Sequence, residues 1–237
     1  MTIFLKYLFR ILLLTTFAYS LAFANNKEIV TNEVIIHNPP KWLKATRVEK
    51  ITNRIQHKLE WSTRKIHIYW YDTLNEFTKT HSFGQLALAV TQHPRGQSII
   101  QMSPKIDSDA FDTIFAHELV HVIVFQKYKE AIPKWLEEGL ANHLSNHDKI
   151  NYKWLASQPF PKDVKDLAHP FASGGASSTL YRYKASQAFA EMLNKKCDLD
   201  NLIRLSVERK MENYMRSYCG IDNLNTAFKD WVTKNAK

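Results

Sequence analysis

The sequence predicts an α+β protein, because strand patterns come first along the chain and helical patterns come later. Ile66, Ile68 and Trp70 fall on one face of the segment 65–71, which is typical of a strand with one buried side. From Ser108 onward the apolar residues recur at helical spacing instead. With 45% hydrophobic and 23% charged residues, the 237-residue chain has a globular composition, which excludes a disordered chain.

Apolar periodicity and turn residues place the individual elements. The expected strands are 34–36, 65–71, 86–91 and 97–102, with a Pro-x-Gly turn at 94–96. The expected helices are 41–60, 72–80, a long one from Ser108, 133–144, 179–194, 199–210 and 222–235. Residues 157–178 show no regular pattern, and the stretch 172–178 is expected to be the most flexible of the sequence.

The first 24 residues have the order of a secretory signal peptide. Lys6 and Arg10 precede an apolar run, and Ala22-Phe23-Ala24 supplies a small-x-small cleavage pattern. The run is short for a membrane span, so an uncleaved N-terminal anchor is the less favoured alternative. We therefore expect an exported protein, periplasmic or secreted. The remaining residues 25–237 are expected to form one domain, with an α/β part (25–130) and a helical part (131–237).

The charge and the cysteine content narrow the possible partners. The net charge is +9, or +7 without the first 24 residues, which favours anionic surfaces such as a membrane but names no partner. No zinc finger or aromatic RNA-binding motif is present, so we expect no nucleic acid. Two cysteines are too few for a four-thiolate metal site, but in an oxidising compartment Cys197 and Cys219 are expected to pair.

The sharpest motif is the segment His117-Glu118-Leu119-Val120-His121. Histidines four residues apart lie on one face of a helix, so both imidazoles can reach one zinc ion. Glu118 is displaced by about 100° around the helix, which leaves it beside the ion as a proton acceptor for water. A pair of core histidines is the alternative interpretation.

A zinc site of this kind needs a third protein ligand. A metzincin-type extension with a Gly and a third His is excluded, because Val124 and Lys127 stand at the matching positions. A carboxylate on the following helix is the other option. The segment Trp135-Leu136-Glu137-Glu138-Gly139-Leu140-Ala141 resembles the Trp-Leu-x-Glu-Gly-x-Ala segment of gluzincin metallopeptidases. A solvated acidic pair at a helix start is the alternative.

The resemblance covers about residues 85–235 and implies a compact zincin-like fold with a small N-terminal mixed sheet, an active-site helix and a C-terminal helical subdomain. On this match Glu138 is the third zinc ligand and Glu137 occupies a variable position, with Gly139 allowing the two helices to approach. The chain lacks the Gly-x-Met-Glu-Asn segment of the aminopeptidases. Asn142 stands where thermolysin-like enzymes carry an Asp that supports a histidine ligand, and it is expected to accept that hydrogen bond more weakly.

The resemblance also implies a donor for the transition-state oxyanion. The segment from Tyr181 to Phe189 resembles the Tyr-x-x-Ser helix start of these domains, which favours Tyr183 as the donor and Tyr181 as the second choice. Packing or surface tyrosines are the alternative. Three histidines are weaker candidates, namely His143, His147 and His169.

Together these features predict an exported zinc-dependent endopeptidase that acts on a peptide or protein substrate. His117, His121 and Glu138 are expected to hold one Zn²⁺, Glu118 to act as the general base, and Tyr183 to stabilise the oxyanion. An extended peptide is expected to pair with the edge of the 86–102 strands. A catalytically silent zincin-fold binding module and a zinc hydrolase of a non-peptide amide remain the alternatives.

Overall fold

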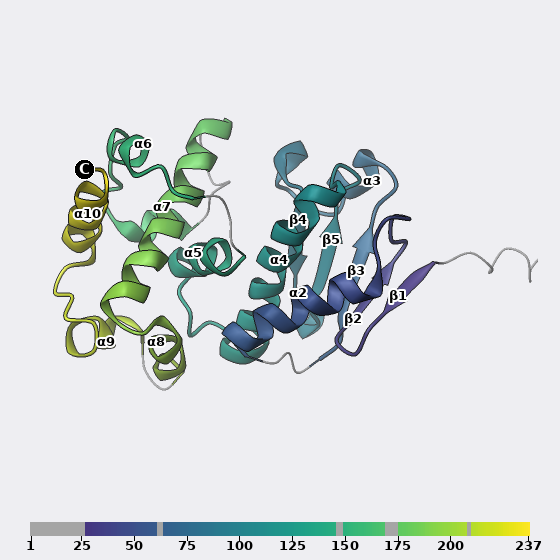
Figure 1. The fold of residues 1–237 in the computed structure, drawn as a ribbon, viewed down its shortest axis with the longest axis horizontal. Coiled ribbons are helices and arrows are strands. Elements are labelled where there is room, and N and C mark those ends of the chain that lie inside the picture. Colours follow the sequence, from purple (N-terminus) through teal and green to yellow (C-terminus); the bar gives the residue numbers. More distant parts are fainter. Residues whose placement is uncertain (1–26, 61–63, 146–148, 169–174, 208–209) are drawn as a thin grey trace, which may run out of the picture.

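The computed structural model describes residues 27–60, 64–145, 149–168, 175–207 and 210–237. It confirms the α+β fold: a five-stranded mixed sheet with two covering helices forms one half, and a cluster of helices forms the other (Figure 1). The expected signal peptide lies outside the described residues. Within the described residues no helix is both long enough and apolar enough to cross a membrane.

The sheet has the strand order β1-β2-β3-β5-β4. Its outer pairs, β1/β2 and β4/β5, are antiparallel, whereas β2/β3 and β3/β5 are parallel. The strands are β1 (Glu28–Val30), β2 (Val34–His37), β3 (Ile66–Trp70), β4 (Ala89–Gln92) and β5 (Ile99–Met102). β1 was not expected from the sequence, and the strand expected from Leu86 begins only at Ala89, after a short 3₁₀ helix (Gly84–Leu86).

One face of the sheet is covered by α2 (Ala45–Lys58) and α4 (Ser108–Tyr128). Burial alternates along β3, where Ile66 and Ile68 are fully buried and point into this layer. Phe111 and Phe115 of α4 meet them from the other side in the same core cluster. Asp107 caps α4 by accepting hydrogen bonds from the first free N–H groups of the helix. The short helix α3 (Leu74–Thr78) lies near β4, and its Phe77 packs with Val90 of β4 in a small second hydrophobic cluster.

The second half of the molecule is helical. Its elements are α5 (Lys134–Leu144), α6 (Tyr152–Ala156), a 3₁₀ helix (Val164–Ala168), α7 (Gly175–Lys196), α8 (Leu199–Leu205), α9 (Glu212–Ser217) and α10 (Leu224–Asn235). Several of these differ from expectation. α6, α9 and the 3₁₀ helix had no predicted counterpart, α7 begins four residues earlier than predicted, and α8 ends at Leu205 although the expected helix ran to residue 210. Residues 175–178, expected to be irregular and flexible, are therefore helical, whereas 169–174 lie outside the described residues.

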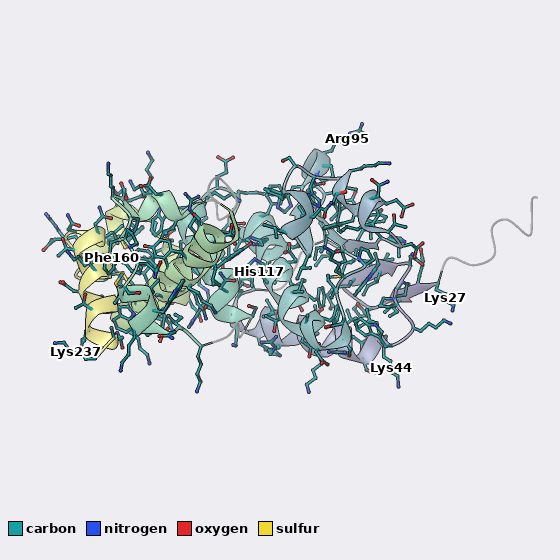
Figure 2. The ribbon with its side chains drawn as sticks, turned by 90° about the horizontal axis from the view of Figure 1, so that it is seen from above. Lys27, Lys44, Arg95, His117, Phe160 and Lys237 are labelled. Carbon is teal, nitrogen blue, oxygen red and sulfur yellow. A yellow bond between two sulfur atoms is a disulfide. The ribbon has the colours of Figure 1, made fainter. Side chains whose placement is uncertain are left out.

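A disulfide between Cys197 and Cys219 confirms the expected pairing. It joins the end of α7 to the turn that follows α9, so it closes a loop containing α8 and α9. The main hydrophobic cluster contains buried residues of the sheet half and of the helical half. His117 on α4 lies midway along the molecule, between the two halves (Figure 2).

Candidate metal centre

Two adjacent helices bring the three expected metal ligands together. His117 and His121 lie one turn apart on α4, and Glu138 lies in the second turn of α5. Their ligand atoms all lie within 4.8 Å of one another. The three side chains are only 12%, 13% and 20% exposed, so water screens them weakly.

The distances among these atoms fit a metal polyhedron. The Nε2 atoms of His117 and His121 are 3.1 Å apart, and they lie 3.5 and 3.7 Å from the Glu138 carboxylate oxygens. Ligands at 2.0–2.1 Å from a tetrahedral zinc are about 3.3 Å from one another. Oε2 of Glu138 is buried and has no hydrogen-bond partner among the described residues, which is costly for a carboxylate unless a cation satisfies it. Two imidazoles and one carboxylate are a typical ligand set of catalytic zinc.

Glu137, the neighbour of the third ligand, supports one histidine. Its Oε1 lies 2.8 Å from Nδ1 of His121, and its Oε2 accepts a hydrogen bond from Lys134 at 2.5 Å. Because a carboxylate only accepts, Nδ1 of His121 carries a proton, and Nε2 is the ring nitrogen that faces His117 and Glu138. This supporting contact of Glu137 was not expected from the sequence. A carboxylate beside a ligand was the available signal, because metal-bound histidines usually donate their second N–H to an oxygen.

The electrostatics of the cluster favour a cation. Burial opposes a charged ring, but the Glu138 and Glu137 carboxylates outweigh it and raise the pKa of His121 to about 9. Burial also opposes the charge of Glu137, yet the hydrogen bonds from His121 and Lys134 lower its pKa to about 2. Burial opposes the charge of Glu138 too, but the neighbouring histidines lower its pKa. The carboxylates thus stay ionised around two imidazole nitrogens.

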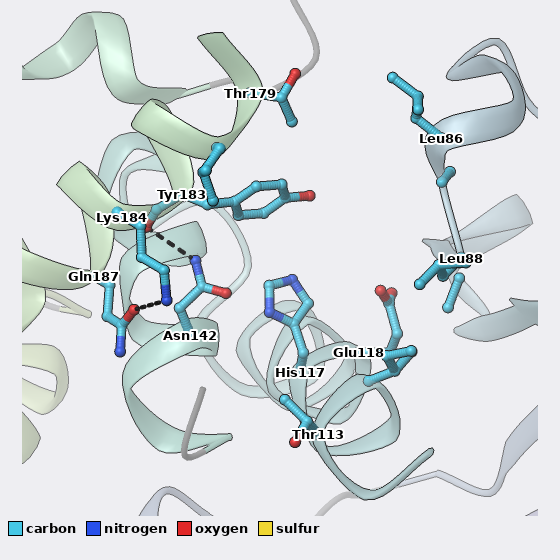
Figure 3. A pocket seen from close by; sticks show the side chains of 14 residues that line it. Leu86, Leu88, Thr113, His117, Glu118, Asn142, Thr179, Tyr183, Lys184 and Gln187 are labelled. Carbon is cyan, nitrogen blue, oxygen red and sulfur yellow. Dashed lines mark hydrogen bonds between the residues drawn. The ribbon is translucent and has the colours of Figure 1, made fainter. Parts of the chain in front are cut away.

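Glu118 and Tyr183 line a pocket next to these ligands (Figure 3). The pocket has a volume of about 340 Å³ and lies between the β4 end of the sheet, α4 and α7. Glu118 is 7% exposed, and its carboxylate points into the pocket. The ring of Tyr183 lies 6.1 Å from that of His117, centroid to centroid, and its hydroxyl also points into the pocket. Burial, together with the charges of Glu138 and Glu118, raises the pKa of Tyr183, which keeps the phenol protonated.

The other candidates lie elsewhere. Tyr181 lines a separate pocket beside Pro159 and Arg182. His143 lies on α5, where burial lowers its pKa; the charge of Glu191 opposes this shift and that of Lys58 adds to it. His147 and His169 lie outside the described residues.

Asn142 lines the pocket, but the expected hydrogen bond from a ligand histidine is not formed. Its amide nitrogen donates to the main-chain oxygen of Tyr183 at 3.3 Å, which ties α5 to α7. Its amide oxygen is buried and has no hydrogen-bond partner among the described residues. Figure 3 shows this oxygen turned towards the ring of His117.

Comparison with known proteins assigns the chain to no family. No protein-family model matches the chain, and no curated protein matches it at a significant level.

Proposed function

We propose that the chain is an exported zinc-dependent endopeptidase of the gluzincin type. The observation that supports this best is the convergence of His117, His121 and Glu138 beside a pocket that also holds Glu118. Three protein ligands of these types would hold zinc and leave a coordination position for water or substrate, as catalytic zinc sites do.

Glu118 is the proton carrier of the proposed reaction. Zinc, when bound, would acidify water and polarise the scissile carbonyl. The Glu118 carboxylate takes a proton from the attacking water, whose oxygen bonds to the carbonyl carbon. It then delivers that proton to the nitrogen of the leaving amine as the carbon–nitrogen bond breaks. Its place in the pocket wall, one residue after His117, gives it access to both positions.

The β4 edge offers main-chain groups to an extended substrate. The N–H of Ser103 donates to the carbonyl of Leu88 at 2.9 Å, and Ala89 faces Met102 in the register. In an antiparallel ladder the pairs alternate, so the N–H and C=O groups of Ala89 and Thr91 point away from β5. A peptide pairing there would run past Glu118.

The pocket suggests an apolar side chain in the substrate. Leu86 and Leu88 on one side and Leu180 on the other are 61%, 37% and 50% exposed, which is unusual for large apolar residues clustered in one place. Figure 3 shows Leu86 and Leu88 facing the α7 wall across the pocket. A bulky apolar residue beside the scissile bond would cover these side chains.

Export agrees with the disulfide, which persists in oxidising compartments and is rare in reducing ones. The signal-peptide pattern of residues 1–24 supports the same proposal. Mature protein prepared from an oxidising compartment is therefore the right material for the tests.

The proposal is tested by cleavage of a peptide library with purified mature protein. We expect one zinc per chain by elemental analysis, internal cleavage that a chelator abolishes, and restoration by added zinc. Glu118→Gln is expected to abolish turnover while zinc stays bound, because the amide keeps the shape but cannot take the proton. Full turnover in Glu118→Gln, or an inert wild type that binds peptide, would contradict the proposal.

Tyr183→Phe tests the oxyanion donor. Loss of one such donor typically lowers kcat about 10²–10³-fold, with little change in KM because the ground state is barely affected. Tyr181→Phe is the matched control, since Tyr181 lines another pocket. Loss of kcat in the Tyr181 variant alone would show that the donor is wrongly assigned.

A further inference from the structure

The edge strand is hydrogen-bonded to the side chain that would move the proton. The Thr91 hydroxyl on β4 lies 2.6 Å from Oε2 of Glu118 and 3.3 Å from the Glu118 main-chain oxygen. A hydroxyl has one proton, and the shorter contact has the length of a charge-assisted O–H···O⁻ bond. Thr91 therefore donates to the Glu118 carboxylate.

This contact restricts the orientation of the Glu118 side chain. Glu has three side-chain torsions, and the Glu118 side chain extends from α4 into the pocket. Fixing Oε2 on Thr91 sets the orientation of the whole planar carboxylate. The second oxygen is then held in a fixed direction relative to His117, the neighbouring residue on α4.

Thr91 also belongs to the substrate side of the site. Its main-chain N–H and C=O point to the free edge of β4, where an extended peptide would pair. One residue thus contacts the general base with its side chain and offers its backbone to the substrate. Thr91 would therefore determine how far the scissile bond of a bound peptide lies from the carboxylate of Glu118.

We propose that Thr91 is a positioning residue that holds the Glu118 carboxylate in register with a peptide bound on β4. The proposal rests on the function proposed above. A change at Thr91 should therefore affect turnover but not metal binding. Both hydrogen bonds described for the Thr91 side chain go to Glu118, and none goes to His117, His121 or Glu138.

The test compares Thr91→Val, which keeps the shape but loses the hydroxyl, with Thr91→Ser, which keeps the hydroxyl. Loss of a hydrogen bond to a charged group predicts a kcat about 10- to 100-fold lower in Thr91→Val. KM is expected to stay within about twofold, because the main-chain groups remain. Thr91→Ser is expected to recover most of kcat, and all variants should bind one zinc.

Thr52→Val is the matched control. Thr52 is fully buried on α2, its hydroxyl has no hydrogen-bond partner among the described residues, and it does not line the pocket. The same loss of a hydroxyl there should leave kcat unchanged. Wild-type kcat in Thr91→Val, a Thr91→Ser variant as slow as Thr91→Val, or loss of zinc in Thr91→Val would each overturn the proposal.

A measurement without turnover separates this proposal from the proposed function. In zinc-free protein labelled at the glutamate carboxyl carbons, the Glu118 signal is identified by its absence in Glu118→Gln. We expect it to shift in Thr91→Val and to stay near the wild-type position in Thr91→Ser. An unchanged signal in Thr91→Val overturns the hydrogen bond itself, whereas a wild type that cleaves no peptide overturns the proposed function and the positioning role of Thr91 with it.

Discussion

At the scale of single residues, the candidate metal centre is distinguished by Glu137. Its carboxylate joins Lys134 to His121 and lies almost fully out of solvent. Such partners fix the ring orientation and raise the basicity of the ligand nitrogen. Glu137 is therefore expected to strengthen metal binding without being a ligand.

Glu137→Gln should weaken zinc binding about tenfold, because an amide oxygen accepts from His121 but lacks the charge that makes the ring a better ligand. Competition against a chromogenic chelator measures the dissociation constant. Glu130→Gln, an exposed substitution just after α4, is the control. Equal zinc affinity in the Glu137 and Glu130 variants would show that Glu137 serves only the ion pair with Lys134.

The sequence predicted that His117, His121 and Glu138 come together, but not which residues contact this cluster, and the reason is geometric. Within one helix, spacing alone determines that His117 and His121 share a face. The Thr91–Glu118 contact joins a strand to a helix 27 residues away, and no periodicity encodes such a meeting. Asn142 shows the converse. The resemblance suggested that its amide oxygen accepts a hydrogen bond from a ligand histidine, but that oxygen has no partner among the described residues, and the amide nitrogen donates to the main-chain oxygen of Tyr183 on α7.

At the scale of elements, segments with a regular apolar pattern were predicted well, and segments without one were not. The strands at 34–37 and 66–70 and the helices α4 and α5 lie where expected, because each buries a regular stripe of apolar residues. β1 has three residues and becomes a strand by pairing with β2, and α9 has six. Such short elements depend on tertiary contacts that a local pattern does not contain.

Gly139 allows a close helix approach, but the partner helix differs from the one expected. A Cβ built on Gly139 would lie 2.1 Å from the main-chain oxygen of Ser186 on α7, so α5 packs against α7 at this point. The side of α7 that faces it carries alanines, including Ala190. This contact holds the Glu138 helix against the helix that carries Tyr183.

Gly139→Ala should therefore destabilise the protein by about 1–3 kcal/mol, since α5 and α7 must separate. The sign is informative, because Gly→Ala within a helix ordinarily stabilises by about 0.5–1 kcal/mol. Denaturant unfolding measures the change, with the exposed Lys229→Ala on α10 as the control. A Gly139→Ala variant as stable as wild type would contradict the close packing.

At the scale of the whole molecule, the candidate metal joins the two halves. His117 and His121 belong to α4, which packs on the sheet, whereas Glu138 belongs to α5 of the helical half; Figure 1 shows the two helices. In the unfolded chain nothing holds Glu138 next to the two histidines, so the site does not exist there. Metal binding is therefore expected to stabilise the folded protein.

The stabilisation should follow mass action, reaching about 2.7 kcal/mol when free zinc is 100 times its dissociation constant. Thermal unfolding of the mature protein should therefore show a higher Tm in excess zinc than in chelator, and Tm should rise further with zinc concentration. Glu118→Gln should respond like wild type, because Glu118 is not a ligand. Glu138→Ala should respond little, since it removes the one ligand that the helical half contributes. An equal Tm with zinc and with chelator would show that the cluster binds no metal that matters to the fold, and the paired charges of His121, Glu137 and Glu138 would then have a structural role only.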